Sequence, residues 1–482
     1  MIAPTTHQST LFYAAFAREA ELLKDDLLEE IDALLDDPGL VRLARERLAS
    51  RAPRSATMGR VGKIAPDQLV RSCALKHIKG WSFRELEREL RGSLVYRRFT
   101  RFGGSPIPTY KTLSRCFAAF GDEGTRAIHE RVVRLSIEEE VARGRKLRTD
   151  TTVVESNVHY PTDSTLLSDG IRVLTRTLGR LAGECQTGAV KVVDHARSTK
   201  HRLLEIHRAA KSLGEAARER MKEGYRRLLS VARGVARQAD GVVADLGRGT
   251  LKLAAEASVT RMVAIEAQLR HFAPLVRRVI AQTEARVFGG DNYVEGKVLS
   301  LFEEHTAAIR KGKLHKPTEF GRLVRVDEVE GGIVSHYEVQ DGNPSDSAAF
   351  LPAIEEHKRT FGRAPRMATA DRGYFSAANV NKAKEGGVKR VAIPGRGRLP
   401  QERSALQKER WFQRALRWRA GIEARIATLK HRFGMLRAFY KGDKGFKRFV
   451  GWSVIAQNLV SIARAKARRK AATDAKQVRR AA

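Results

Sequence analysis

The chain is poor in cysteine and has no long apolar run. Three of its 482 residues are cysteines, Cys73, Cys116 and Cys185, and none belongs to a CxxC pair. This argues against a disulfide framework or a zinc finger, and predicts small buried thiols in a reducing cytoplasm. A run of about 20 apolar residues, which a membrane-spanning helix needs, is absent. Residues 1–10 lack a basic start followed by an apolar stretch, so we expect no secretory signal.

Positive charge, in contrast, is in large excess. Lys and Arg number 90 against 55 Asp and Glu, which gives a formal net charge of +35 and a pI of about 10.6. Such an excess favours a polyanionic partner, and nucleic acid is the leading candidate because each neutralised phosphate releases condensed counterions. A ribosome-associated protein is one alternative, and a membrane-surface protein is a weaker one. The length and the 42% hydrophobic content suggest two to four domains, or one domain with a large insertion.

The N-terminal part of the chain is predicted to be helical. Residues 1–60 are assigned to a helical arm, Phe12–Leu48, and a linker, and residues 61–140 to a compact helical block. Ser82 and Glu85 form a capping box in this block. A Gly/Pro-rich turn then leads to a basic helix start at Thr109–Thr112.

A helix, a turn and a second helix with a basic entry are typical of DNA-binding modules. We therefore predict that residues 61–140 bind DNA and that Lys111 and Arg115 contact it. An ordinary helical bundle whose basic residues are solvated is the alternative.

Strands are expected only after residue 140. Leu147–Val154 has the β-branched density of a strand, and a helical insertion of about 120 residues, roughly 164–285, follows. Apolar residues recur at helical steps from Met262 to Val279, with Pro274 among them, which indicates a kinked helix or two helices. We expect a helical hairpin or bundle. Internal packing is the preferred role for this seam, and a dimer interface is the alternative.

The remaining chain predicts a mixed sheet. The further expected strands are Leu323–Val326, Ile333–Val339, Arg366–Ala370 and Val388–Ile393. A long helix, Gln401–Phe433, and a helix near Trp452–Ala463 follow, and residues 464–482 are expected to form a loose basic tail. The prediction is an α/β domain over residues 141–463 with a five-stranded mixed sheet and a helical insertion.

Three carboxylates occupy positions where an α/β sheet carries ligands. Asp150 is inside or at the end of the first strand, Asp371 ends the fourth, and Glu423 lies within the long helix. Converging carboxylate oxygens would bind Mg²⁺ or Mn²⁺. Two such ions about 4 Å apart activate the attacking oxygen and stabilise the leaving oxygen in a phosphoryl displacement.

The helix that carries Glu423 has a basic face. Arg419, Glu423 and Lys430 fall within about 40° of one another around the helix axis. An apolar stripe on the adjoining face would pack on the sheet. A salt-bridged, solvated surface is the alternative interpretation. Trp411 and Trp418 are expected to pack in the core, with stacking on a displaced base as the alternative.

Other polar residues near these positions are weaker candidates. Glu155, Asp163 and Asp169 are chemically possible rivals of Asp150. Asp327 is expected to be a turn residue. His159 and His336 are expected to be structural or surface residues, and their assignment as ligands is weaker still.

Several motifs, in this order along the chain, resemble the DDE insertion-sequence transposases, and specifically their insertion-sequence-five-like group. The motifs are Pro66–Phe120 with Gly80–Leu86, Thr149–Asn157 with Tyr160–Leu167, Arg310–Lys313 with Pro317–Gly321, Ala370–Ser376, and the spacing of Arg419, Glu423 and Lys430. The likeness covers about residues 60–460. Leu416 stands where the group's helix signature has a tyrosine, and the long insertion is a second departure.

The resemblance implies a ribonuclease H-like catalytic domain with Asp150, Asp371 and Glu423 as catalytic metal ligands for Mg²⁺, for which Mn²⁺ may substitute. It implies that Arg419 and Lys430 hold DNA phosphates. The expected partners are double-stranded DNA, as transposon ends and target, and a second copy of the chain in the synaptic complex, in the bacterial nucleoid. The expected reaction is strand cleavage followed by strand transfer. A non-catalytic DNA-binding derivative and a structure-specific nuclease are the alternatives.

Overall fold

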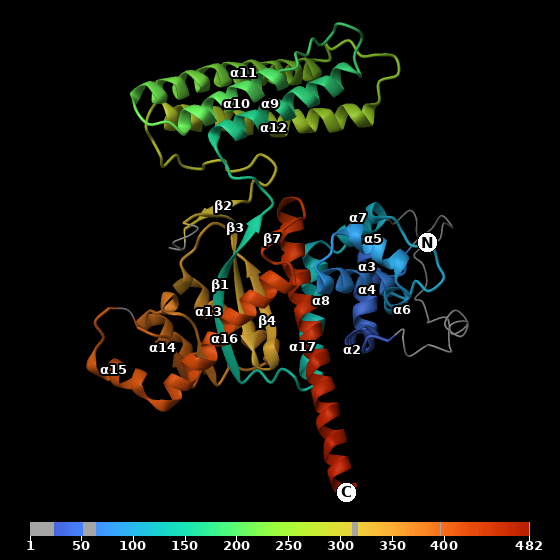
Figure 1. Ribbon diagram of the computed structural model, residues 1–482, viewed down its shortest axis with the longest axis vertical. Helices are drawn as coiled ribbons and strands as arrows, with labels where there is room; N and C mark the ends of the chain where they lie inside the picture. The colour runs from blue at the N-terminus through green and yellow to red at the C-terminus, as the bar shows by residue number, and fades with distance from the viewer. Residues whose placement is uncertain (1–23, 52–63, 311–316, 396, 482) are drawn as a thin grey trace. The chain divides into compact units, whose positions relative to one another are not determined.

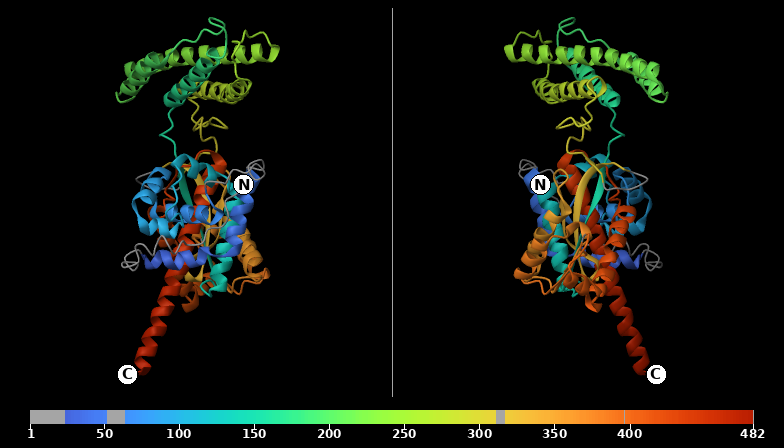
Figure 2. Two further views of the ribbon diagram at one scale, coloured as in Figure 1. Left: turned by 90° about the vertical axis from the view of Figure 1, so that its right-hand side faces the viewer. Right: turned by 90° about the vertical axis from the view of Figure 1, so that its left-hand side faces the viewer.

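The computed structural model describes residues 24–51, 64–310, 317–395 and 397–481. The chain forms two compact units, one of residues 1–157 and 309–482 and the other of residues 158–308 (Figures 1 and 2). The predicted motif at Arg310–Lys313, and most of the linker expected before residue 62, lie outside the described residues. No helix in the described ranges is long and apolar enough to cross a membrane.

The first unit begins with short helices, as the sequence predicts. They are α2 (Asp26–Leu35), α3 (Pro38–Arg51), α4 (Pro66–Lys79), α5 (Phe83–Gly92), α6 (Leu94–Phe99), α7 (Tyr110–Ala118) and α8 (Gly121–Glu138). The capping box that opens α5 is confirmed: Ser82 N donates to Glu85 Oε2 (2.7 Å), and Glu85 N donates to Ser82 Oγ (3.2 Å). Cys73 and Cys185 are buried and Cys116 is half-buried, all as free thiols.

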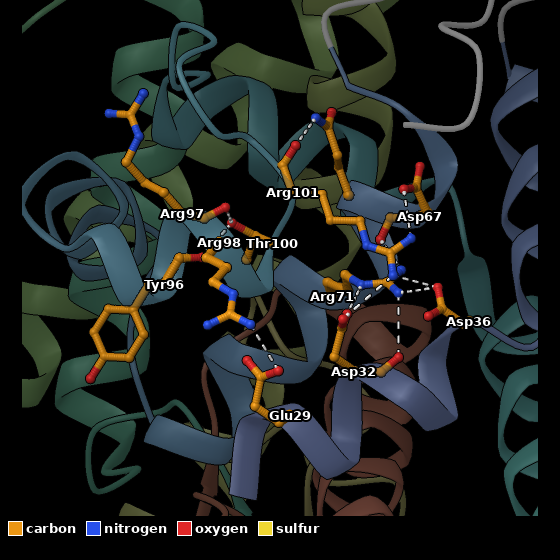
Figure 3. A network of polar contacts seen from close by, with 11 residues as sticks. Glu29, Asp32, Asp36, Asp67, Arg71, Tyr96, Arg97, Arg98, Thr100 and Arg101 are labelled. Carbon is orange, nitrogen blue, oxygen red and sulfur yellow. Dashed lines mark hydrogen bonds and ion pairs between the residues drawn. The ribbon is translucent and has the colours of Figure 1, made fainter. Parts of the chain in front are cut away.

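Acidic residues of α2 bind arginines of α4 and α6 (Figure 3). The fully buried Arg71 donates to Asp32 Oδ1 (2.5 Å) and to Asp36 Oδ1 (2.8 Å). Arg98 donates to Glu29 Oε2 (3.0 Å). Glu29, Asp32 and Asp36 therefore neutralise internal cations and hold α2 on the helical block.

A seven-stranded mixed sheet follows. Its strands are β1 (Lys146–Ser156), β2 (Ala307–Ile309), β3 (Glu319–Val329), β4 (Ile333–Val339), β5 (Met367–Thr369), β6 (Arg390–Ala392) and β7 (Arg437–Ala438). The order is β2-β3-β1-β5-β6, with β4 paired to β3 and β7 to β1. β3 is antiparallel to β1, and β5 and β6 continue the sheet in parallel. All five predicted strands are present. The prediction of five lacked β2 and β7, which have three and two residues and stand in no run of β-branched residues.

Helices cover the sheet: α13 (Phe350–Phe361), α14 (Ala377–Glu385), α15 (Gln401–Lys408), α16 (Arg410–Arg432) and α17 (Gly442–Ala481). The helix predicted over Gln401–Phe433 is two helices, because Glu409 between them has an extended backbone (φ −59°, ψ 141°). The loose tail expected over residues 464–482 is also wrong. α17 continues to Ala481, because Ala, Lys, Arg and Gln are strong helix formers and an already formed helix has no nucleation cost.

The second unit is a bundle of four helices: α9 (Asp163–Ala182), α10 (Ala196–Ala210), α11 (Glu215–Arg248) and α12 (Val259–Val287). α12 is one helix with Pro274 inside it, so the two-helix alternative is wrong. The seam from Met262 to Val279 belongs to the bundle's own hydrophobic core, with Leu269 and Val279 fully buried. The seam therefore packs internally and is no exposed dimer interface.

Candidate active site

The sheet register brings Asp150 and Asp371 to neighbouring positions. β1 and β5 are parallel, and Arg148 pairs with Thr369. Asp150 lies two residues further along β1, and Asp371 lies two residues beyond Thr369, past the end of β5. The two aspartates therefore follow paired positions of adjacent strands, whose backbones are about 4.8 Å apart where they pair.

Both aspartates accept a hydrogen bond from the backbone. Asp150 Oδ1 accepts from Thr151 N (2.7 Å), and Asp371 Oδ1 accepts from Arg372 N (2.6 Å), where it caps a short 3-10 helix. Asp150 is half-buried within β1, between β3 and β5, and Asp371 is exposed just beyond the end of β5. Each carboxylate thus has a backbone contact that limits its rotamers and leaves acceptor positions on its oxygens.

α16 packs on β1 and β5. Arg148, two residues before Asp150, donates to the carbonyl oxygen of Trp418, and its guanidinium lies 4.7 Å from the centre of the Trp418 ring. Glu423 is the next turn of α16. Its side chain is 66% exposed and bonds Arg419 Nη2 through Oε1 (2.9 Å). Glu423 therefore lies on the helix that packs on β1 and β5, within the i, i+4 salt bridge that was the alternative interpretation of this helix face.

A buried carboxylate joins α16 to the two central strands. Glu328 of β3 is fully buried and accepts from Arg148 Nε (2.9 Å) and Nη2 (2.7 Å). Arg425 of α16 donates to the same carboxylate (3.2 Å). The sequence analysis missed this cluster, since its members lie up to 277 positions apart along the chain and no motif links them. It fixes α16, and with it Glu423, relative to β1.

No group of three or more His, Cys, Asp or Glu side chains is close enough to hold a metal ion in the ranges that the structure covers. Asp150 and Asp371 follow paired positions of adjacent strands, and the Glu423 carboxylate accepts a hydrogen bond from Arg419. The donor set nevertheless fits a hard divalent cation: all three groups are carboxylates, and Mg²⁺ prefers oxygen ligands and retains several waters.

The rival carboxylates make ion pairs with arginines. Arg437 donates to Glu155 Oε2 (2.7 Å), and Arg172 donates to Asp169 Oδ1 (2.6 Å). Asp163 pairs with Arg286. These contacts give each acid a structural role within its own unit.

Two further expectations concern the strands around β3. Asp327 was expected in a turn and is instead a fully buried residue of β3. It accepts from Thr149 Oγ1 (2.6 Å) and Arg325 Nε (3.0 Å), and its burial raises the pKa of its carboxyl. His336 lies in β4, where burial lowers its pKa to about 4 and keeps the ring neutral, in agreement with a structural role. His159 is 3.6 Å from Asp169.

The residues expected to bind DNA lie on two helices. Lys111 and Arg115 are exposed on α7, which begins at Tyr110, close to the predicted start. Arg419 is largely covered, and Lys430 is half-buried further along α16. Contact with DNA stays a prediction for all four.

The aromatic and apolar residues of α16 pack against the sheet. Leu416, at the place of the family's tyrosine, packs against a small cluster formed by Ala392, Phe412 and Ala415. Trp418 lies against Lys146 and Arg148. Leu416 thus fills core space and supplies no hydroxyl.

Two models of known protein families match parts of the chain. The model of the Transposase DDE domain matches residues 324–459, and that of a Transposase domain (DUF772) matches residues 16–119. The chain carries the domains of a DDE-type insertion-sequence transposase. The DDE match contains Asp371 and Glu423 and begins after Asp150, so Asp150 lies outside the matched residues. Neither the comparison with curated proteins nor that with solved structures gave a match.

Proposed function

We propose that the chain is a DNA transposase of the insertion-sequence-five-like group, with Asp150, Asp371 and Glu423 as its catalytic triad. It binds the inverted repeats of its element, cleaves a strand at each end and joins the exposed 3′-hydroxyl to target DNA. The observation that carries the proposal is the parallel pairing of β1 with β5, which brings together the strand that contains Asp150 and the strand that precedes Asp371, in a chain with a DDE domain match.

The strand order supports a ribonuclease H-like fold for this domain. A long antiparallel pair, β1 with β3, is extended on one side by β4 and on the other by the parallel strands β5 and β6. Asp371 then lies just past the carboxyl end of β5, where open α/β sheets bind ligands, and Asp150 lies within the adjacent parallel strand β1.

DDE transposases generally depend on divalent metal, and the three carboxylates would hold Mg²⁺ here. When bound, the metal lowers the pKa of a water that attacks the phosphodiester and neutralises charge on the leaving oxygen. The protein's own contribution is to position the DNA strand and the nucleophile, since phosphoryl transfer requires little covalent chemistry from side chains.

Arg419 is proposed to exchange partners during this reaction. In the structure its guanidinium bonds Glu423, and both groups lie on the same face of α16 as Lys430. Engagement of Glu423 by a cation would leave Arg419 to bond a DNA phosphate, to which its planar fork is suited. This exchange would couple assembly of the triad to DNA binding. We further propose that two copies act together, one at each DNA end.

A cleavage assay on DNA carrying the element's own ends tests this function. Asp371→Asn keeps the size of the side chain and its bond to Arg372 N but removes a negative oxygen. We expect at least a thousandfold loss of Mg²⁺-dependent cleavage. The matched control is Asp341→Asn, whose side chain is 92% exposed and pairs with Arg322 away from the aspartates. Undiminished cleavage by Asp371→Asn would contradict the proposed triad.

A non-catalytic DNA-binding derivative is the second candidate, favoured by the exposed Glu423 and its ion pair with Arg419. It predicts DNA binding by the wild-type chain with no cleavage at any Mg²⁺ or Mn²⁺ concentration. The same assay therefore separates the two.

A further inference from the structure

A cavity of about 710 Å³ opens beside the C-terminal end of α16, in the first unit. Its walls come from α4, α5 and α7 on one side and from residues 433–449 on the other. This volume is in the range of sites that bind small organic ligands. The residues that line the cavity lie far apart in the sequence, so the cavity could not be predicted from the sequence.

Aromatic rings form much of the cavity wall. Phe83 and Tyr440 lie nearly parallel, with ring centroids 5.8 Å apart and an interplanar angle of 21°. Phe449 packs edge-on against Tyr440, at 5.0 Å between centroids. Phe439, also in the lining, is 62% exposed, although such a large apolar group is normally covered. Flat aromatic surfaces of this kind stack nucleobases of any sequence.

A buried cation stands among these rings. Lys76 of α4 is 4% exposed, and its Nζ lies 5.0 Å from the centroids of both Phe83 and Tyr440. Burial lowers the pKa of Lys76 to about 8, so most of the population is charged at neutral pH. Glu85, the nearby acid of the lining, directs Oε2 to the backbone N–H of Ser82 (2.7 Å).

Among the described residues Lys76 forms no direct ion pair with a carboxylate, and Glu85 acts on it electrostatically. A buried charge without a direct ion pair is costly, and such a site favours an incoming anion. Lys441 and Arg448 also line the cavity and add positive charge. The lining thus combines stacking surfaces for an aromatic group with a cation for an anionic one.

We propose that this cavity binds one unstacked nucleotide of a DNA strand, with its base stacked on the aromatic wall and its phosphate near Lys76. The inference rests on DNA being the substrate, as proposed above. Phe433, in the lining, follows the last residue of α16, and Arg432 lies nine residues after Glu423. The cavity is therefore about 14 Å along the helix from the candidate triad, or roughly four base steps of ~3.4 Å.

Binding to two 2-aminopurine duplexes tests the proposal. In one the 2-aminopurine is fully paired, and in the other it is an unpaired bulge. We expect the wild-type chain to bind the bulged duplex about tenfold more tightly, as a stacked base warrants, and to quench its fluorescence. Lys76→Met and Phe439→Ala should bring the affinity ratio to about one while paired-duplex binding stays within about twofold. Lys79→Met, one turn along α4 and outside the cavity, is the matched control and should retain the preference.

Three results would overturn the inference. The wild-type chain could bind the two duplexes with equal affinity, or Lys76→Met and Phe439→Ala could both keep the wild-type preference. The third result is that both variants lose paired-duplex binding and thermal stability together with the preference. Free deoxyadenosine 5′-monophosphate at millimolar concentration forms a further arm. If it abolishes the preference, it supports a nucleotide site; if it binds while the duplexes are not distinguished, a DNA source is contradicted. Absence of any duplex binding would instead contradict the transposase proposal itself.

Discussion

The three proposed catalytic carboxylates differ in how the fold supports them. Asp150 lies within a long central strand, and its backbone is held by pairing with Val326 of β3. Asp371 follows a three-residue strand and is held by its cap on Arg372. Glu423 is exposed, and its side chain bonds Arg419 one turn earlier on the same helix. Of the three acids, Glu423 therefore depends most on the packing of its own helix. The buried cluster of Glu328, Arg148 and Arg425 holds that helix on the sheet.

Buried neutral histidines give the catalytic unit a predictable acid sensitivity. His129 of α8 is buried, its Nε2 lies 3.0 Å from Val334 O, and burial lowers its pKa to about 3. In the unfolded chain its pKa is about 6.5. Unfolding therefore takes up a proton below pH 6.5, so this stability is fully present above pH 6.5 and is lost as the pH falls towards 3.

We predict that the free energy of unfolding falls by up to about 1.4 kcal/mol per pH unit from this residue between pH 6 and 4. In His129→Gln, whose amide can still donate to Val334 O, the pH dependence should be shallower by that amount. Urea denaturation at several pH values measures it. His336 and His357, with pKa values lowered to about 4, keep part of the slope in the variant. Identical slopes in both proteins would contradict the assignment.

At the scale of elements, the position of α16 depends on one buried charge cluster. Glu328 accepts from Arg148 of β1 and from Arg425 of α16. Gly421 allows this approach, because a Cβ there would collide with the Arg148 guanidinium, which Glu328 prevents from moving away. Arg148, Glu328 and Arg425 thus determine the position of the helix segment that carries Glu423.

Glu328→Gln should therefore destabilise the chain by about 3–5 kcal/mol, because it leaves buried guanidinium groups without a counter-charge. The measurement is urea denaturation at pH 7. Glu355→Gln, which removes a 69% exposed partner of Lys358 on α13, is the matched control and should cost less than about 1 kcal/mol. A Glu328→Gln variant as stable as that control would show that the cluster does not hold α16.

Elements with strong local signals could be predicted from the sequence, and those without them could not. β-branched runs gave β1, β3 and β4, and the Ser82–Glu85 box gave the start of α5. The short β7 is a strand only because Glu155 and Ser156 offer a partner backbone. Likewise Asp371 and Glu423 could be predicted from their motifs and from their positions in the expected elements. The role of Glu328 and the cavity around Lys76 depend on tertiary contacts alone.

On the scale of the whole molecule, the insertion is compatible with the sheet because of where it enters. β1 ends at Ser156, and the chain returns to the sheet at β2, which pairs with β3 on the side opposite β1. The bundle of residues 158–308 has its own hydrophobic core. A unit with its own core can be inserted at such a point while the pairing of β1 with β3 is kept.

The net charge of +35 suits a chain that binds DNA through several surfaces. Part of the charge is used internally, as with Arg71 and Arg98, which bind the acids of α2. Basic residues on the exposed C-terminal part of α17 are available in addition. Charge alone thus indicates the partner, while the register of the sheet indicates where chemistry would occur.

The central claim is that Asp150, Asp371 and Glu423 act as one catalytic unit. The most direct measurement is Mg²⁺-dependent joining of element ends to target DNA by Asp150→Asn, Asp371→Asn, Glu423→Gln and the triple variant, with Glu155→Gln as the matched control. We predict that each triad variant falls to the same residual rate, that the triple variant is no slower, and that Glu155→Gln stays close to wild type. Separate, additive losses, or loss of activity in Glu155→Gln with Asp150→Asn active, would contradict the account.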